Sequence, residues 1–204
     1  MLLPVTNISR IRAGTDGHGI RTLVCAAGCP LRCRYCINPH TQNMDHVRKF
    51  FSADELYETL RIDNLYFMAT DGGVTFGGGE PGLYAAFIHE FAKKYGGSWS
   101  INMETSLNFP RENLLLLRDA IDYYFIDIKD MDPEIYKAYT GGDNSLVLDN
   151  LKYLCESNCQ HKIRIRIPQI EGYNTAENCD ASEAYCRSMG LLDIDRFRYS
   201  VKKE

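Results

Sequence analysis

Three cysteines in one short loop form the clearest chemical pattern of this sequence. Cys29, Cys33 and Cys36 are spaced C-x3-C-x2-C. Three thiolates from one loop can hold three irons of a four-iron cluster and leave the fourth iron without a protein ligand. An iron with an open position can bind a substrate or cofactor directly. The loop therefore predicts a reaction centre rather than a structural clip.

Zinc is the alternative ion for this loop. A structural zinc site takes four ligands, commonly arranged as two separated pairs. The three cysteines instead share one loop, and His40 is the residue that could complete the set. The spacing therefore favours an iron–sulfur cluster. Cys25 lies four residues before Cys29, and we expect it to be a buried thiol rather than a ligand, because free cysteine is among the most buried residue types.

Length and composition restrict the class of protein. The 204 residues suit a single domain over residues 1–204 with a sizeable core. The net charge of −4 argues against a nucleic-acid partner, which usually requires a basic domain. The sequence contains no run of 18 apolar residues that would span a membrane, and its N-terminus does not resemble a secretory signal. Eight cysteines without such a signal indicate reduced thiols in the cytoplasm.

Short apolar runs alternate with amphipathic stretches along the chain. The runs predict strands at Ile20–Val24, Gly73–Phe76, Ser98–Met103, Tyr123–Ile128, Ile163–Ile167 and Phe197–Val201. Spacings of three and four residues predict helices that begin after the capping box Ser52–Glu55 and near Leu83–Tyr95, Arg111–Ile121, Leu146–Cys155 and Ala176–Met189. This alternation predicts an α/β fold in which crossover helices join parallel strands. Six such units would form an open, partial (β/α)6 barrel.

Ligands in such folds gather at the carboxyl ends of the strands. The chemically interesting residues of this sequence lie there. The cysteine loop follows the first predicted strand and Gly77–Glu80 follows the second. Glu104 follows the third, and Asp127 and Lys129 end the fourth. Burial of a charge without a partner is costly, so the two charges on the otherwise apolar fourth strand favour a functional role.

The cysteine loop together with Gly-Gly-Glu after the next strand resembles the radical S-adenosylmethionine (SAM) superfamily. The resemblance implies that Cys29, Cys33 and Cys36 hold a [4Fe–4S] cluster. It also implies that the amino and carboxylate groups of SAM chelate the open iron. In that superfamily, one electron from the cluster breaks the sulfonium carbon–sulfur bond and generates a 5′-deoxyadenosyl radical. The protein positions and tunes a cofactor that carries the difficult chemistry.

A second motif narrows the resemblance to the activating enzymes of glycyl-radical enzymes, of the pyruvate formate-lyase activating type. The segment from Asp16 to Arg21 is similar to their DGxGxR motif, with His18 in place of the usual proline. The resemblance implies that Asp16, Gly17, Gly19 and Arg21 contact the glycine loop of a partner enzyme. It further implies an electron donor of the flavodoxin or ferredoxin type.

The same resemblance assigns residues to the two ends of SAM. Tyr35 and Asn38 would contact the adenine. Gly78, Gly79 and Glu80 would surround the methionyl amino group. The match to the family runs from about residue 11 to residue 174.

Four charged residues complete the implied cofactor site. Glu104 occupies the position of a family aspartate that also meets the amino group. Asp127 would reach the ribose hydroxyls or a bound monovalent cation. Lys129 would pair with the methionyl carboxylate, and Arg166 would support the same pocket. These assignments match opposite charges, because carboxylates face an ammonium group and basic groups face a carboxylate.

The C-terminal sequence departs from the family pattern. The family usually has a Pro-Tyr-His segment and a further tail, whereas this sequence reads Tyr199-Ser200 and then Val-Lys-Lys-Glu. Either Ser200 takes the place of the histidine that helps to hold SAM, or the chain is a shortened member that lacks the usual tail.

Four further cysteines leave an auxiliary cluster as an alternative to structural thiols. Cys155 and Cys159 are one helical turn apart, and Cys179 and Cys186 are two turns apart. Related activating enzymes carry extra clusters in a ferredoxin-like insert after the cysteine loop. The segment between Cys36 and residue 77 contains no cysteine, so we expect the four thiols to be helix-core residues.

Two other functions remain open at the level of sequence. One keeps the radical chemistry but changes the target to a peptide, a small metabolite or an anaerobic ribonucleotide reductase. The other is a non-catalytic metal-binding or electron-carrier protein, which would require four protein ligands for the cluster.

Overall fold

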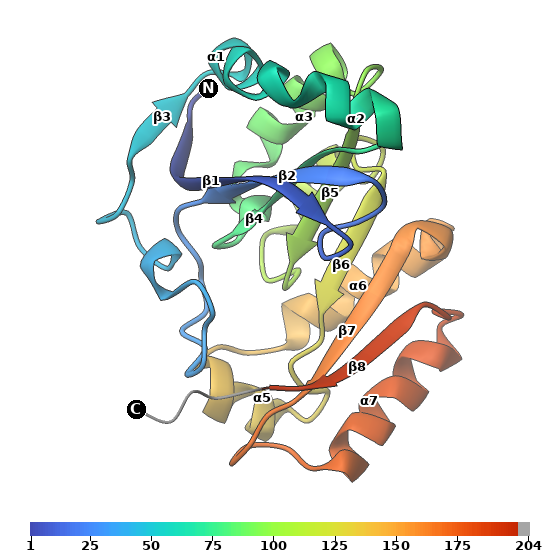
Figure 1. Ribbon diagram of the computed structural model, residues 1–204. Coiled ribbons are helices and arrows are strands. Elements are labelled where there is room, and N and C mark those ends of the chain that lie inside the picture. The colour runs from blue at the N-terminus through green and yellow to red at the C-terminus, as the bar shows by residue number, and fades with distance from the viewer. Residues whose placement is uncertain (200–204) are drawn as a thin grey trace.

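A single curved sheet organises the chain. The computed structural model describes residues 1–199, which contain an eight-stranded sheet in the order β3-β1-β2-β4-β5-β6-β7-β8 (Figure 1). The strands are β1 (Leu3–Ala13), β2 (Ile20–Ala26), β3 (Lys49–Phe51), β4 (Gly73–Gly78), β5 (Ser100–Thr105), β6 (Tyr123–Asp127), β7 (Ile163–Gln169) and β8 (Ile194–Arg198).

The six strands β2, β4, β5, β6, β7 and β8 are parallel to one another. They form the six units of the open, partial barrel that the sequence predicts, and β3 and β8 are the two free edges of the sheet. The predicted strands match the observed ones closely except the last. That strand begins at Ile194 instead of Phe197, because the charged residues Asp195 and Arg196 hide its apolar alternation. The remainder of that predicted strand, beyond residue 199, lies outside the described residues.

The helices pack on the outer side of this sheet (Figure 1). They are α1 (Ala53–Leu60), α2 (Asn64–Thr70), α3 (Ala85–Tyr95), α4 (Arg111–Leu117), α5 (Pro133–Thr140), α6 (Ser145–Glu156) and α7 (Ala176–Ser188). The predicted capping box is confirmed, because Ser52 and Glu55 exchange side-chain-to-backbone hydrogen bonds at the start of α1. A second capping box, formed by Thr175 and Asn178, starts α7.

The N-terminal part of the sheet was not predicted from the sequence. β1 and β3 are antiparallel to their neighbours, so an all-parallel sheet is wrong for this edge. The physical reason is the short connection between β1 and β2. The turn over residues 14–19 contains three glycines and is too short for a crossover helix. Helices α2 and α5 were also not predicted.

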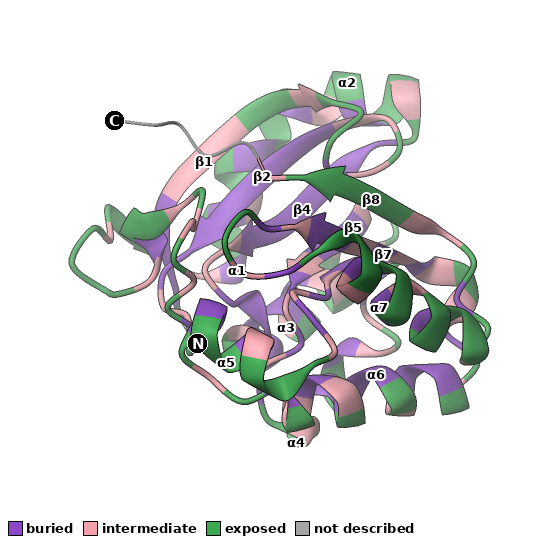
Figure 2. Cartoon of the chain, turned by 90° about the horizontal axis from the view of Figure 1, so that it is seen from below, coloured by how far each residue is buried: buried purple, intermediate pink, exposed green. Residues whose placement is uncertain are grey.

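The two faces of the central strands differ in polarity. Val24, Phe76, Met103 and Ile126 belong to the apolar core that the helices cover. Alternate residues of the same strands face the inside of the barrel, because strand side chains alternate between faces. The inner residues of these strands and of β7 include Arg21, Glu104, Asp127 and Arg166. Figure 2 shows that the central strands are buried, whereas the edge strand β8 is largely exposed. Among the described residues, no helix is both long and apolar enough to cross a membrane.

Candidate active site

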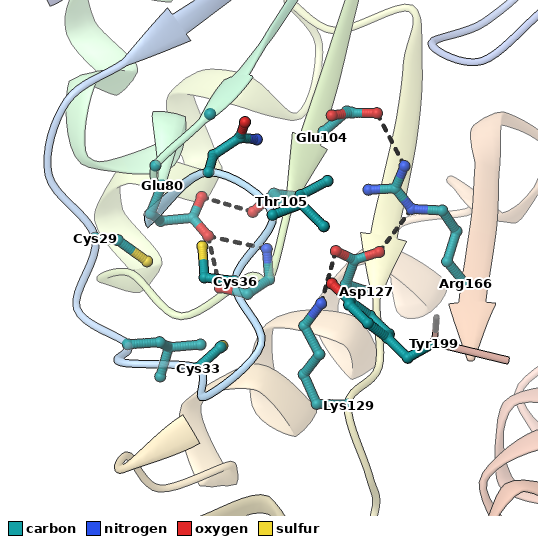
Figure 3. Close-up of a pocket in the computed structure, with 16 residues that line it drawn as sticks. Cys29, Cys33, Cys36, Glu80, Glu104, Thr105, Asp127, Lys129, Arg166 and Tyr199 are labelled. Atoms are coloured by element: carbon teal, nitrogen blue, oxygen red, sulfur yellow. Dashed lines mark hydrogen bonds and ion pairs between the residues drawn. The ribbon is translucent and has the colours of Figure 1, made fainter. Parts of the chain in front are cut away.

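One cavity at the carboxyl ends of the strands collects most of the residues that the sequence singled out (Figure 3). Its walls come from the cysteine loop and from the ends of β4, β5, β6 and β7. The predicted residues that line it are Cys29, Cys33, Cys36, Asn38, Gly78, Gly79, Glu80, Glu104, Asp127, Lys129 and Arg166.

The cysteine loop is held in place by its backbone. The amide of Arg32 donates to the carbonyl of Thr140 at 2.7 Å, and the amide of Arg34 donates to the carbonyl of Tyr139 at 3.1 Å. Both carbonyls belong to the last turn of α5, which is thereby anchored beside Cys33. On the other side of the loop, the amide of Gly28 donates a hydrogen bond to the carbonyl of Thr41 at 2.7 Å.

Burial disfavours the charged form of two of the three thiols. Burial raises the pKa of Cys29 to about 12, and burial also raises the pKa of Cys33. Both thiols would therefore stay protonated at neutral pH in the absence of a nearby cation. Iron entering the cavity would supply the charge that stabilises the thiolates. His40, the residue that could complete a zinc site, does not line this cavity.

Two glycines allow the end of β4 to pass close to the cysteine loop. Gly78 has a φ of +89°, and a Cβ there would lie 2.7 Å from the Cα of Cys25. A Cβ on Gly79 would lie 2.3 Å from the carbonyl oxygen of Gly28. Any side chain at these positions would push the strand end away from the loop. The glycines therefore keep backbone groups exposed to the cavity.

Glu80 is fixed by four hydrogen bonds and is 1% exposed. One carboxylate oxygen accepts from the amide of Gly82 at 3.1 Å and from Thr105 Oγ1 at 2.7 Å. The other accepts from the amide and the Oγ of Ser106, at 2.9 and 2.6 Å. Burial raises the pKa of Glu80, while these donors act in the opposite direction. The carboxylate thus ties the end of β4 to the end of β5 at the cavity wall.

Four charges on three neighbouring strand ends form a continuous chain (Figure 3). Arg166 donates to Glu104 Oε1 at 2.9 Å and to Asp127 Oδ1 at 2.6 Å. Lys129 donates to Asp127 Oδ2 at 2.9 Å. The charges of the two acidic and two basic side chains neutralise one another. The four side chains can therefore be partly buried without a further ion. Lys129 lines the cavity, and within residues 1–199 its ammonium uses one of its three donors, which leaves two for a further ligand.

The acid sensitivity of the fold should depend on Asp127. Burial opposes its ionisation, but Lys129 and Arg166 outweigh burial and lower its pKa to about 2. The ordinary value is near ~3.9. Ionised Asp127 therefore stabilises the fold above about pH 4, and this contribution of about 2 kcal/mol is lost as the pH falls towards 2. Urea denaturation at several pH values measures the free energy of unfolding. Between pH 4 and 2, this free energy should fall less steeply for Asp127→Asn than for the unchanged protein. A slope equal to that of the unchanged protein would contradict the assignment.

The loop that resembles DGxGxR uses its polar groups internally. A bulge in β1, where Ile11 has a φ of 55°, directs Arg12 towards the loop. Arg12 pairs with Asp16, which is 1% exposed, and Nη2 donates to Oδ1 at 2.9 Å. The carbonyl of Asp16 accepts from Thr75 Oγ1 at 2.9 Å and from Asn102 Nδ2 at 3.2 Å.

The glycines of this loop are required by close approach to other elements. A Cβ on Gly17 would lie 2.2 Å from the side-chain nitrogen of Asn102. A Cβ on Gly19 would lie 2.3 Å from the carbonyl oxygen of Thr70. Both residues have positive φ, so glycine is favoured on two grounds. The motif thus packs the loop against β5 and the end of α2.

Arg21 is buried, with 1% exposure. It donates to the carbonyls of Val74 and Ser100 at 2.6 and 2.9 Å and to Thr75 Oγ1 at 3.2 Å. The resemblance implies that Arg21 contacts a partner enzyme. In the structure its guanidinium instead supports the loop from inside the protein. Arg21 joins the starts of β4 and β5 beneath the loop.

We expect Arg21→Met to destabilise the protein by ~3 kcal/mol, because three buried acceptors lose a charged donor. Arg187 on α7 makes an exposed ion pair with Glu183 and provides the control, since Arg187→Met should change stability by less than about 0.5 kcal/mol. Equal unfolding midpoints in urea for the two variants would show that the Arg21 contacts contribute little.

Several candidates lie outside the cavity. The ring of Tyr35 packs against Tyr139 and Tyr173, at centroid distances of 6.2 and 5.8 Å, and does not line the cavity. Cys25 is 4% exposed on β2, as expected for a buried thiol. The four remaining cysteines, Cys155, Cys159, Cys179 and Cys186, are all buried against the apolar core.

Three polar residues of the site were not among those predicted from the sequence. Thr105 and Ser106 supply three of the four donors to Glu80. Tyr199 lies beside Asp127 and Lys129 at the rim of the cavity (Figure 3). Its amide donates to the carbonyl of Gln169 at 2.9 Å, which fixes its position after β8. Ser200, which the sequence offered as the replacement for the family histidine, lies outside the described residues.

A larger groove of about 730 Å³ adjoins the cavity. The two share residues at the strand ends, including Asn38, Lys129 and Tyr199. The far wall of the groove contains Arg12 and the loop residues Gly14, Thr15 and Asp16, together with residues of β8. A macromolecular ligand entering this groove would meet the DGxGxR-like loop before it reached the cavity.

Comparisons with known proteins agree with this arrangement. The radical SAM superfamily matches residues 23–180. The 4-hydroxyphenylacetate decarboxylase activating enzyme of Clostridium scatologenes is 30% identical over 247 aligned positions, which cover 90% of this chain and 79% of that protein. Because the alignment is longer than the 204 residues of this chain, the relative contains residues that this chain lacks.

Two solved structures share the fold. A domain of the pyruvate-formate lyase-activating enzyme from Bacteroides vulgatus is 29% identical, covers 65% of this chain and 84% of its own, and superposes with a TM-score of 0.56. SuiB of Streptococcus suis bound to S-adenosylmethionine superposes with a TM-score of 0.65 over 85% of this chain and 39% of its own. Its identity of 17% shows the common fold alone.

Proposed function

The chain belongs to the radical SAM superfamily, among the relatives of glycyl-radical-enzyme activating enzymes, and we propose that it activates a glycyl-radical enzyme by abstracting hydrogen from one glycine. The observation that carries this proposal is the cavity itself. Its three free thiols face the four-charge chain of Glu104, Arg166, Asp127 and Lys129. This pairing suits a cluster on one wall and a charged amino acid on the other.

The family implies a [4Fe–4S] cluster and SAM, and the residues present fit both groups. The loop thiols Cys29, Cys33 and Cys36 would hold the cluster. When bound, the two groups supply one-electron cleavage of SAM to a carbon-centred radical. The contribution of the protein is to exclude water and to orient SAM so that the radical forms next to the groove.

The polar residues of the cavity would orient SAM by its charges. The Lys129 ammonium would donate to the methionyl carboxylate, and Arg166 would hold Asp127 in place beside it. The backbone of Gly78 and Gly79 and the carboxylate of Glu104 would receive the methionyl amino group. Asp127 would face the ribose or a monovalent cation.

The groove and its loop would receive the partner. We propose that the backbone of residues 14–17 contacts the glycine loop, because Asp16 and Arg21 use their side chains inside the protein. A backbone contact suits a target glycine, which offers no side chain to recognise. We propose that residues 1–204 form one radical SAM domain. The protein would act in the cytoplasm, with an electron donor of the flavodoxin or ferredoxin type.

The test is anaerobic incubation of the reconstituted protein with SAM, a reductant and each glycyl-radical enzyme encoded in the same genome. We expect a glycyl-radical doublet in the electron paramagnetic resonance spectrum with one of these enzymes. SAM cleavage without this signal for any of them would contradict the activating function and would favour a peptide or a small metabolite as the substrate.

A further inference from the structure

We propose that the outer face of the cysteine loop is the docking surface for an acidic one-electron carrier protein. The proposal rests on the function proposed above and concerns how the cluster receives its electron. The surface consists of Arg32, Arg34 and Lys137, and we call it the basic rim. Arg32 and Arg34 precede and follow Cys33, and Lys137 is exposed on α5, the helix that anchors the loop.

The loop presents different side chains on its two sides. The three cysteines line the cavity, whereas the side chains of Arg32 and Arg34 are exposed and line neither the cavity nor the groove. Consecutive Cα atoms are ~3.8 Å apart, so each arginine lies one residue from a cluster ligand. A carrier bound to the basic rim would be separated from the cluster by little more than one layer of backbone.

Hydrogen bonds fix the backbone that carries the two arginines of the basic rim. The amides of Arg32 and Arg34 are bound to the last turn of α5. The guanidinium of Arg32 also donates to the carbonyls of Cys29 and Leu31, at 2.5 and 2.8 Å. A surface that keeps its shape binds a partner with a smaller loss of entropy.

These charges also lack acidic partners. Within residues 1–199, no carboxylate lies within 4.0 Å of the charged nitrogens of Arg32, Arg34 or Lys137. Most arginines elsewhere are paired with acids, namely Arg10, Arg12, Arg61, Arg118, Arg164, Arg166, Arg187 and Arg196.

Unpaired positive charge beside the cluster selects the partner by its chemistry. The chain as a whole carries a net charge of −4, so an acidic protein would be repelled by much of the surface and attracted to this part. Such complementarity steers association and raises its rate more than its affinity. A transient, small interface of this kind is typical of electron-transfer complexes. Since the groove lies on the other side of the loop, the carrier and the glycyl-radical enzyme can bind at the same time.

The experiment measures reduction of the reconstituted cluster by an acidic flavodoxin hydroquinone, which loses one electron to become the semiquinone while the cluster gains one. We would compare the unchanged protein with Arg34→Glu/Lys137→Glu, which leaves the loop contacts of Arg32 intact. Lys93→Glu/Lys152→Glu makes the same change of net charge on α3 and α6 and is the matched control.

We expect the reversal of the basic rim to lower the second-order rate constant at least tenfold at low ionic strength. Added salt should slow the reduction of the unchanged protein by flavodoxin but should not slow that of the reversed variant. Photoreduction by deazariboflavin, a small neutral reductant, should proceed equally in all three proteins. Equal flavodoxin rates in all three, or an equal loss in the control, would overturn the docking surface. Failure to cleave SAM after photoreduction would instead overturn the proposed function.

Discussion

Replacement of Cys29 by serine should abolish both the cluster and SAM cleavage, whereas replacement of Cys25 should preserve both. The two cysteines are four residues apart, and Cys25 is buried whereas Cys29 is half-buried. They differ in position, because Cys29 lines the cavity and Cys25 lies on β2 outside its lining. Serine cannot replace a thiolate as a soft ligand for iron. A loop with two thiols would therefore leave two irons without protein ligands.

The measurement is iron and sulfide content after anaerobic reconstitution, together with 5′-deoxyadenosine formed from SAM under photoreduction. The unchanged protein should hold about four irons per chain. Cys25→Ser should match it, apart from a stability loss of about 1–3 kcal/mol for a hydroxyl buried on β2. SAM cleavage by Cys29→Ser at the unchanged rate would contradict the assignment of the reaction centre. About eight irons in the unchanged protein would show an auxiliary cluster among the four C-terminal cysteines.

The sequence predicts the parts of this site that depend on local pattern. The cysteine spacing and the apolar periodicity of the strands are both short-range features. Their combination places Asp127, Lys129 and Glu104 at the same edge of the sheet without knowledge of any contact. The structure brings these residues into one charge network for the same reason, since adjacent parallel strands end side by side.

Local sequence pattern does not predict residues whose role depends on contacts between distant segments. The motif implies that Arg21 contacts a partner enzyme, but its side chain donates to the carbonyls of Val74 and Ser100, 53 and 79 positions away. Thr105 and Ser106 become part of the site because Glu80, 25 and 26 positions earlier, requires donors. Only an accounting of buried polar groups could have suggested them.

The N-terminal edge was missed for a different reason. β1 lacks a regular alternation of polar and apolar residues, because its register with β2 shifts twice, and its pairing with β2 is decided by the turn between them. A sequence that otherwise alternates strands and helices favours the parallel interpretation. The antiparallel hairpin still has a functional consequence, because its turn is the loop that forms the far wall of the groove.

Lys129→Met should weaken SAM binding roughly 10- to 150-fold, which corresponds to the ~1.5–3 kcal/mol of a charge-assisted hydrogen bond. Lys129 lines the cavity, and within residues 1–199 only one contact of its ammonium, to Asp127, is made by a side chain. Burial lowers its pKa, but the charge of Asp127 outweighs burial and the net shift is upward, so the ammonium persists at neutral pH.

Decarboxylated SAM separates this role of Lys129 from a general loss of structure. The unchanged protein should prefer SAM to this analogue, and Lys129→Met should reduce that preference roughly 10- to 150-fold without abolishing it, because the carboxylate loses the ammonium but would keep the open iron. Lys152→Met, which removes one exposed charge on α6, should retain the full discrimination. Calorimetric titration of the cluster-loaded proteins measures all six affinities. An undiminished preference for SAM in Lys129→Met would assign the carboxylate to another cation of the protein, and Arg166 would then be the candidate in the same charge chain.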